Sequence, residues 1–113
     1  MNDDQKRIDA LVKNNRVVLF MKGTAQFPMC GFSGRAMQIL KACNVEDLTT
    51  VNVLEDEGVR QGIKEYANWP TIPQLYVNGE FVGGSDILME MYQAGELQAL
   101  LDAGSSSPGV ARA

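Results

Sequence analysis

Residues 22–35, with the sequence KGTAQFPMCGFSGR, decide the fold of this chain. An apolar run at 17–21 precedes this stretch, and a helical pattern at 36–43 follows it. The order strand, loop, helix places Cys30 at a helix N-terminus, where free backbone N–H groups and the helix dipole favour negative charge. A thiol held there loses its proton more readily, and the thiolate is the form that attacks disulfides or binds metal. We therefore interpret Cys30 as the reactive centre, with Lys22 as the nearest cation in sequence.

Length and composition limit the classes of function. The chain has 113 residues, room for one modest core, and its net charge of −4 argues against nucleic acid as a partner. Histidine is absent, which removes Cys–His catalysis, Ser–His–Asp catalysis and every zinc site that contains histidine. No apolar stretch approaches the roughly 18 residues of a membrane span, and the polar N-terminus lacks a signal-peptide pattern. We expect a cytoplasmic protein in a reducing compartment, with no membrane contact.

Hydrophobic periodicity predicts alternating helices and strands. Asp3 or Asp4 is expected to cap a first helix that ends at Asn14, and Ser85 or Asp86 to cap a later one that stops near Gly95. The other predicted elements are strands at 16–21, 48–53, 74–77 and 80–82, and helices at 36–43, 56–67 and around 97–101. A strand–helix–strand unit makes the first two strands parallel, whereas Asn-Gly at 78–79 predicts a hairpin.

This order of elements predicts an α/β fold of the thioredoxin-like type, with three layers and a four-stranded mixed sheet flanked by helices. Residues 1–103 are expected to form this one domain. Residues 104–113 are rich in Ser and Gly and are predicted to be a disordered C-terminal tail.

Residues 30–33, CGFS, resemble the signature of monothiol glutaredoxins. The likeness spans roughly residues 4–102 and extends to the segments MKGT, FPM, WPTIPQLYV and GEFVGG, at 21–24, 27–29, 69–77 and 79–84. The short length is similar to that of the single-domain, bacterial-like members. Two departures stand out, because Ala25 replaces a proline of many members and Ser85 replaces a second cysteine, so that GGCDI becomes GGSDI.

The resemblance implies that Cys30 is both the nucleophile of any thiol chemistry and a ligand of a [2Fe–2S] cluster. Such a cluster commonly takes four thiolates, but Ser33 stands where a CxxC motif has its second cysteine. Cys43 is separated from Cys30 by about 20 Å of helix, too far for a disulfide or a shared cluster, and is predicted to be a core residue. The family pattern therefore implies a homodimer in which two chains and two glutathione molecules supply the four sulfurs.

A glutathione groove is expected from the same resemblance. Lys22 and Arg60 would hold the glycine carboxylate through charge-assisted hydrogen bonds. Ile72, before an expected cis Pro73, would pair its backbone with the tripeptide as an added strand does. Trp69 is predicted to be a packing residue rather than a ligand contact.

The start of the helix after Gly84 would hold the other end of the tripeptide. Backbone N–H groups of Ser85 and Asp86 would bind the γ-glutamyl carboxylate, and the Asp86 side chain would accept its ammonium. Gly84 would let the ligand approach the backbone closely, and Phe32 would form a wall of the site. Structural roles also remain open here, since Asp86 could be only a helix cap and Lys22 only a solvated lysine.

Three functions remain compatible with the sequence. The first is an iron–sulfur carrier that transfers its cluster to apo-proteins, with BolA-like proteins as further partners implied by the resemblance. The second is a glutathione-dependent thiol–disulfide oxidoreductase, expected to be slow because the CGFS loop resembles that of the low-activity branch. The third is a non-catalytic binding module, in which replacement of Cys30 would change nothing.

Overall fold

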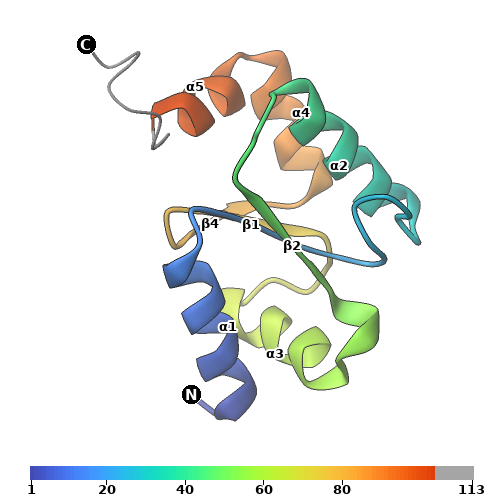
Figure 1. Ribbon diagram of the computed structural model, residues 1–113, viewed down its shortest axis with the longest axis vertical. Helices are drawn as coiled ribbons and strands as arrows, with labels where there is room; N and C mark the ends of the chain where they lie inside the picture. The colour runs from blue at the N-terminus through green and yellow to red at the C-terminus, as the bar shows by residue number, and fades with distance from the viewer. Residues whose placement is uncertain (104–113) are drawn as a thin grey trace.

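The computed structural model describes residues 1–103, and the predicted tail at 104–113 lies outside the described residues. Five α-helices and one 3₁₀ helix, η1, surround a four-stranded sheet in the described part of the chain (Figure 1). In chain order the elements are α1 Asp3–Asn14, β1 Val17–Met21, α2 Gly31–Ala42, β2 Leu48–Asn52, η1 Val53–Glu55, α3 Glu57–Ala67, β3 Gln74–Val77, β4 Glu80–Gly83, α4 Ser85–Gln93 and α5 Glu96–Ala103.

The sheet is mixed, with the strand order β2-β1-β3-β4. β1 pairs in parallel with β2 and antiparallel with β3, and β3 continues into β4 as a hairpin. Asn78 and Gly79 both have positive φ, 54° and 81°, as a type I′ turn requires. The predicted thioredoxin-like fold class, with its parallel pair and hairpin, is confirmed.

The central strand β1 separates two cores, and all five of its residues are buried. Val17, Leu19 and Met21 face a core with α2, α4 and α5, whereas Val18 and Phe20 face a core with α1 and α3. Figure 1 shows these two helical layers on opposite sides of the sheet. Apolar side chains on both faces explain why the strand is a continuous hydrophobic run in the sequence.

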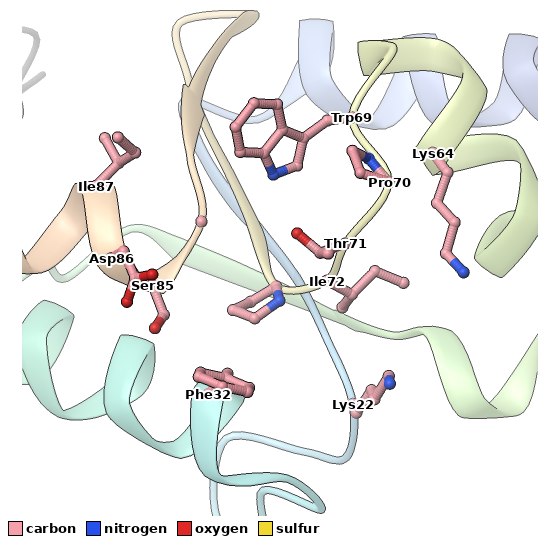
Figure 2. A pocket seen from close by; sticks show the side chains of 12 residues that line it. Lys22, Phe32, Lys64, Trp69, Pro70, Thr71, Ile72, Ser85, Asp86 and Ile87 are labelled. Atoms are coloured by element: carbon pink, nitrogen blue, oxygen red, sulfur yellow. The ribbon is translucent and has the colours of Figure 1, made fainter.

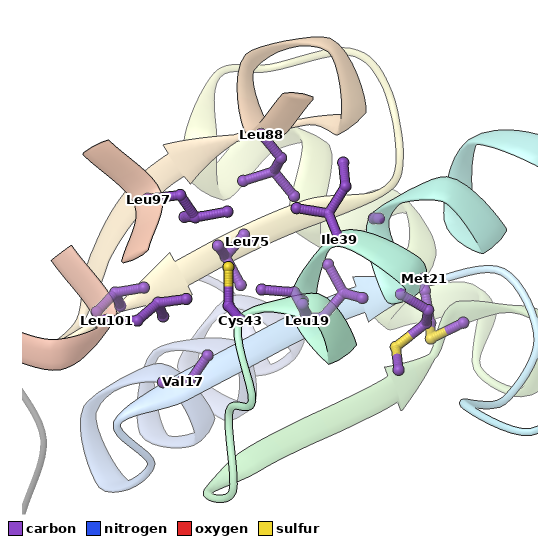
Figure 3. Close-up of a cluster of buried hydrophobic side chains, with 13 residues drawn as sticks. Val17, Leu19, Met21, Ile39, Cys43, Leu75, Leu88, Leu97 and Leu101 are labelled. Atoms are coloured by element: carbon purple, nitrogen blue, oxygen red, sulfur yellow. The ribbon is translucent and has the colours of Figure 1, made fainter. Parts of the chain in front are cut away.

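Cys43 belongs to the first of these cores. It is 3 % exposed at the C-terminal end of α2 and belongs to the same cluster of buried side chains as Val17, Leu75 and Leu101 (Figure 3). Burial raises the pKa of this thiol, and Asp102 adds to the shift. The prediction of a core residue at position 43 is confirmed.

Two predicted helix caps are wrong. Asn2 caps α1 in place of Asp3 or Asp4, because its side chain and that of Gln5 each accept the other's backbone N–H in a capping box. Gly84 is the N-cap of α4 in place of Ser85 or Asp86, which lie inside the first turn.

Candidate functional site

The loop between β1 and α2 is held by its own backbone. The Met29 N–H donates to the Lys22 carbonyl at 2.8 Å, and Gly23 forms a β-bridge with Pro28. Gly23 has φ +97°, and a Cβ there would lie 2.5 Å from the Met29 nitrogen and from the Phe27 oxygen. Only glycine therefore fits at the point where the chain leaves the sheet and turns towards the cysteine.

Asn52, the last residue of β2, ties this loop to the neighbouring strand. Its Oδ1 accepts the Gly23 N–H at 2.9 Å and the Leu54 N–H at 3.0 Å. One side-chain oxygen thus links the start of the cysteine loop to η1, the short helix that leads into α3.

Cys30 is the N-cap of α2, as the sequence predicts. Its sulfur accepts the Ser33 N–H at 3.3 Å and lies 3.4 Å from the Ser33 hydroxyl. That hydroxyl is fully buried and accepts the Lys22 N–H at 3.0 Å, so Ser33 fixes the thiol relative to the end of β1.

Opposing influences set the acidity of Cys30. Partial burial acts to raise the pKa of the thiol, whereas hydrogen bonds from the Ser33 side chain and from the Ser33 and Phe32 backbones act to lower it. The positive charge of Lys22 acts in the same direction, and the net result is a pKa below the ordinary value of 9.0. Cys30 is therefore the more acidic and the more accessible of the two cysteines.

A cavity of about 390 Å³ opens beside the start of α2 (Figure 2). Its lining comes from segments far apart in the sequence. The lining residues are Lys22 and Phe32 on either side of the cysteine loop, Lys64 on α3, residues 69–73 before β3, and residues 84–87 at the start of α4. Cys30 is not itself a lining residue but lies two positions before Phe32. The structure thus brings seven of the predicted site residues to one cavity.

Arg60 is the predicted glutathione-binding residue that does not line this cavity. Lys64, one turn later on α3, is a lining residue instead, and it supplies with Lys22 two cations on one side of the space. Positions four apart lie on the same helix face, so the sequence pattern predicts a cation on this face but not which turn reaches the cavity.

The segment before β3 forms the floor of the cavity. The Ile72–Pro73 peptide bond is cis, as predicted. Trp69 packs against Phe81 with ring centroids 5.6 Å apart and also lines the cavity, so the predicted packing role describes only part of its position.

The N-terminus of α4 faces the two lysines across the cavity (Figure 2). No side chain caps this helix, and a Cβ on Gly84 would lie 3.1 Å from the Pro73 oxygen. Ser85 is 5 % exposed and its hydroxyl has no hydrogen-bond partner. The Asp86 carboxylate is exposed, with Arg35 of α2 at 3.9 Å. Opposite charges thus lie at the two ends of the cavity: cations at one end, and a carboxylate beside helix N–H groups at the other.

The site contains a single reactive thiol. Within residues 1–103 no three Cys, Asp or Glu side chains come together as a metal-binding group.

In that same range no helix is both long enough and apolar enough to cross a membrane.

Comparison with known proteins places the chain in a family. Residues 17–82 match the Glutaredoxin family model. A monothiol glutaredoxin of Synechocystis sp., itself uncharacterised, is 57 % identical over 108 residues, which are 95 % of this chain and 100 % of that protein. One from Porphyra purpurea is 53 % identical over 88 % of this chain and 92 % of its own length. The solution structure of reduced poplar apo GrxS14 is 52 % identical with a TM-score of 0.76, covering 88 % of this chain and 91 % of that one. Together with the single acidic thiol, these matches show that the chain belongs to the monothiol glutaredoxins.

Proposed function

We propose that this protein binds glutathione in the cavity beside Cys30 and carries a [2Fe–2S] cluster as cargo between two copies of the chain. The observation that carries the proposal is the single available thiol. A [2Fe–2S] cluster commonly takes four thiolates, and Cys30 is the one sulfur of the chain that is both acidic and accessible. Cys43 is buried at the far end of α2. The remaining sulfurs must therefore come from a second chain and from small thiols.

The charge pattern of the cavity supports glutathione as that small thiol. Glutathione carries a carboxylate at each end and an ammonium at one of them. Lys22 and Lys64 match the glycine carboxylate, and the uncapped start of α4 matches the γ-glutamyl carboxylate. The exposed Asp86 carboxylate matches the ammonium. Ile72, Pro73 and Gly84 would give the tripeptide backbone a close seat, with Phe32 as a wall near the sulfur.

The cluster would be held in a homodimer and passed to apo iron–sulfur proteins. Phe27, Met29 and Phe32 are exposed around Cys30, at 77 %, 67 % and 59 %, and support a face that meets another protein. A BolA-like protein is the proposed alternative partner to the second chain, and the cytoplasm the proposed compartment.

Reconstitution with iron, sulfide and glutathione under anaerobic conditions tests the proposal. The wild-type protein is expected to show the visible absorption of a [2Fe–2S] cluster and to elute as a dimer with one glutathione per chain. Cys30→Ser should stay colourless and monomeric. Cys43→Ala, the matched control, should load normally because that thiol lies in the core. Coloured material that contained one chain and no glutathione would overturn the proposal.

A glutathione-dependent oxidoreductase is the second candidate, and the lowered pKa of Cys30 favours it. The Cys30 thiolate would attack the glutathione sulfur of a mixed disulfide, release the client thiolate and become glutathionylated. A second glutathione thiolate would then attack that sulfur, releasing glutathione disulfide and the Cys30 thiolate. We expect slow turnover in a glutathione-coupled disulfide assay, and turnover equal to that of dithiol glutaredoxins would reverse the ranking of the two functions.

A further inference from the structure

We propose that Gln74 and Tyr76 are positioning residues that hold the segment 69–73 in the shape that binds the backbone of the ligand. The inference rests on the proposed function, since it takes glutathione as the ligand of the cavity. Neither residue is among those that line the cavity, so each acts through its neighbours.

Gln74, the first residue of β3, is a fully buried polar side chain. Burial of an amide is costly unless new hydrogen bonds replace those that it makes with water. Here Nε2 donates to the carbonyls of Trp69 and Thr71 at 3.2 and 3.1 Å, and Oε1 accepts from the Tyr76 hydroxyl at 3.0 Å. An apolar side chain of the same size would fill the space without these requirements, so the two carbonyls that the amide holds explain the glutamine.

Tyr76 sets which end of this amide meets the two carbonyls. It is buried and lies on the same face of β3, two residues after Gln74. Burial raises the pKa of its hydroxyl, so the group stays protonated and donates to Oε1. With Oε1 engaged, the donor end of the amide is turned towards Trp69 and Thr71.

These contacts fix the direction of one peptide group of the cavity floor. Among residues 1–103 the cis peptide bond is Ile72–Pro73, so the Thr71–Ile72 peptide is trans. In a planar trans peptide the C=O and the N–H point in opposite directions. Because the Thr71 carbonyl is held against Gln74, the Ile72 N–H points away from that buried amide. Ile72 lines the cavity (Figure 2), so its N–H is placed to meet a carbonyl of the tripeptide.

Loss of this support should affect binding and leave the thiol unchanged. Without the amide, the carbonyls of Trp69 and Thr71 lose their donor and the peptide before Ile72 is free to rotate. The acidity of Cys30 depends on other contacts, chiefly with Ser33. A general loss of packing would change both properties, whereas a positioning role changes only the affinity.

The test measures the affinity for S-methylglutathione by titration calorimetry, because the blocked sulfur of this probe prevents thiol exchange. The variants are Gln74→Met, which keeps the volume and removes the amide, Tyr76→Phe, which keeps the ring, and the double variant. Tyr66→Phe is the matched control, because Tyr66 packs against Tyr76 with ring centroids 5.9 Å apart but donates to Asp9 at 2.6 Å. The pH midpoint of Cys30 alkylation is measured for every protein.

We expect Gln74→Met to weaken binding of the probe about tenfold, the effect of one lost hydrogen bond, and Tyr76→Phe about threefold. Adding Tyr76→Phe to Gln74→Met should change the affinity less than about twofold, because the hydroxyl acts through the amide. Tyr66→Phe should bind as the wild type does, and the Cys30 midpoint should be the same in all variants. Should Gln74→Met fail to fold, the comparison of Tyr76→Phe with Tyr66→Phe decides.

Full affinity in Gln74→Met would overturn the role of Gln74. Equal losses in Tyr66→Phe and Tyr76→Phe, or a Tyr76→Phe effect of the same size in the wild type and in Gln74→Met, would overturn the route through the amide. A Cys30 midpoint that moves together with the affinity would overturn the positioning role in favour of a general loss of structure. Failure of the wild-type protein to bind S-methylglutathione would overturn the proposed function and this inference together.

Discussion

The chemistry of the chain depends on how Ser33 contacts Cys30. Ser33 takes the position that a second thiol would occupy in a CxxC motif, and its buried hydroxyl bridges the cysteine sulfur and the Lys22 N–H. The serine thus removes a resolving thiol but keeps a hydrogen bond that stabilises the thiolate. Nucleophile and cluster ligand are both roles that need a deprotonated sulfur, so this contact serves either proposed function.

Substitution of Ser33 should raise the pKa of Cys30. Ser33→Ala removes the side-chain hydrogen bond, whereas Lys22→Gln removes only the charge effect, which is the smaller influence. We expect the pH midpoint of Cys30 alkylation by iodoacetamide to move up towards 9.0 in Ser33→Ala, and to move less in Lys22→Gln. Peptide mass spectrometry separates Cys30 from Cys43, which should stay unmodified in the folded protein. A larger shift in Lys22→Gln would assign the acidity to charge instead.

At the scale of elements, an ion pair joins α1 to the start of α3. Asp56 is the N-cap of α3, accepting the Val59 N–H at 3.1 Å, and also accepts from Arg7 of α1 at 2.8 Å. The hydrogen bond from Arg7 is the main cause of a lowered Asp56 pKa, and the Val59 backbone contributes next. A carboxyl whose pKa is lower in the folded state stabilises the fold above its unfolded pKa, and this contribution is lost as the pH falls through the folded value.

Asp56→Asn should therefore reduce the acid sensitivity of the fold. Asparagine still caps the helix but carries no charge, so the change isolates the ion pair. Between pH 7 and the region below 3.8, the ordinary carboxyl pKa, the urea midpoint should fall less for Asp56→Asn than for the wild type. Glu90→Gln, which removes an exposed carboxyl of α4, should follow the wild-type profile. Identical profiles for wild type and Asp56→Asn would show that the pair contributes nothing measurable.

At the scale of the whole molecule, the two cysteines mark opposite ends of α2. Cys30 is the N-cap and Cys43 the C-cap of this twelve-residue helix, so about 20 Å separates them. A disulfide needs Cα atoms closer than about 7 Å, and the helix cannot shorten without unfolding. Thiol oxidation of the folded chain must therefore involve another molecule.

Oxidation by glutathione disulfide should give only two products. We expect a monomer glutathionylated at Cys30 and a dimer linked Cys30 to Cys30, both visible by non-reducing mass spectrometry. Cys43→Ala should give the same two species, whereas Cys30→Ser should give neither. A dominant Cys30–Cys43 bond would contradict both this prediction and the continuity of α2.

The sequence predicts the fold well because its signals are local and strong. A buried central strand is a continuous apolar run, Asn-Gly requires two positive φ values, and a cysteine between strand and helix becomes the helix cap. Two of the wrong predictions concern the cation that lines the cavity and the residue that caps α4. In both cases two nearby residues of one segment could fill the position, and the sequence does not show which one does. Lys64 rather than Arg60 lines the cavity, and the two positions lie four apart on the same helix face, so the sequence pattern does not distinguish them. Gly84 rather than Ser85 becomes the cap, at a position where a Cβ would lie 3.1 Å from the Pro73 oxygen.

The side-chain oxygen of Asn52 links two parts of the site, at Gly23 and Leu54, that lie about thirty residues apart in the sequence. It holds both the turn that leads to the nucleophile and the short helix that leads to the lysine of α3. We therefore expect any movement of the loop that carries Cys30 to be correlated with movement of the short helix before α3.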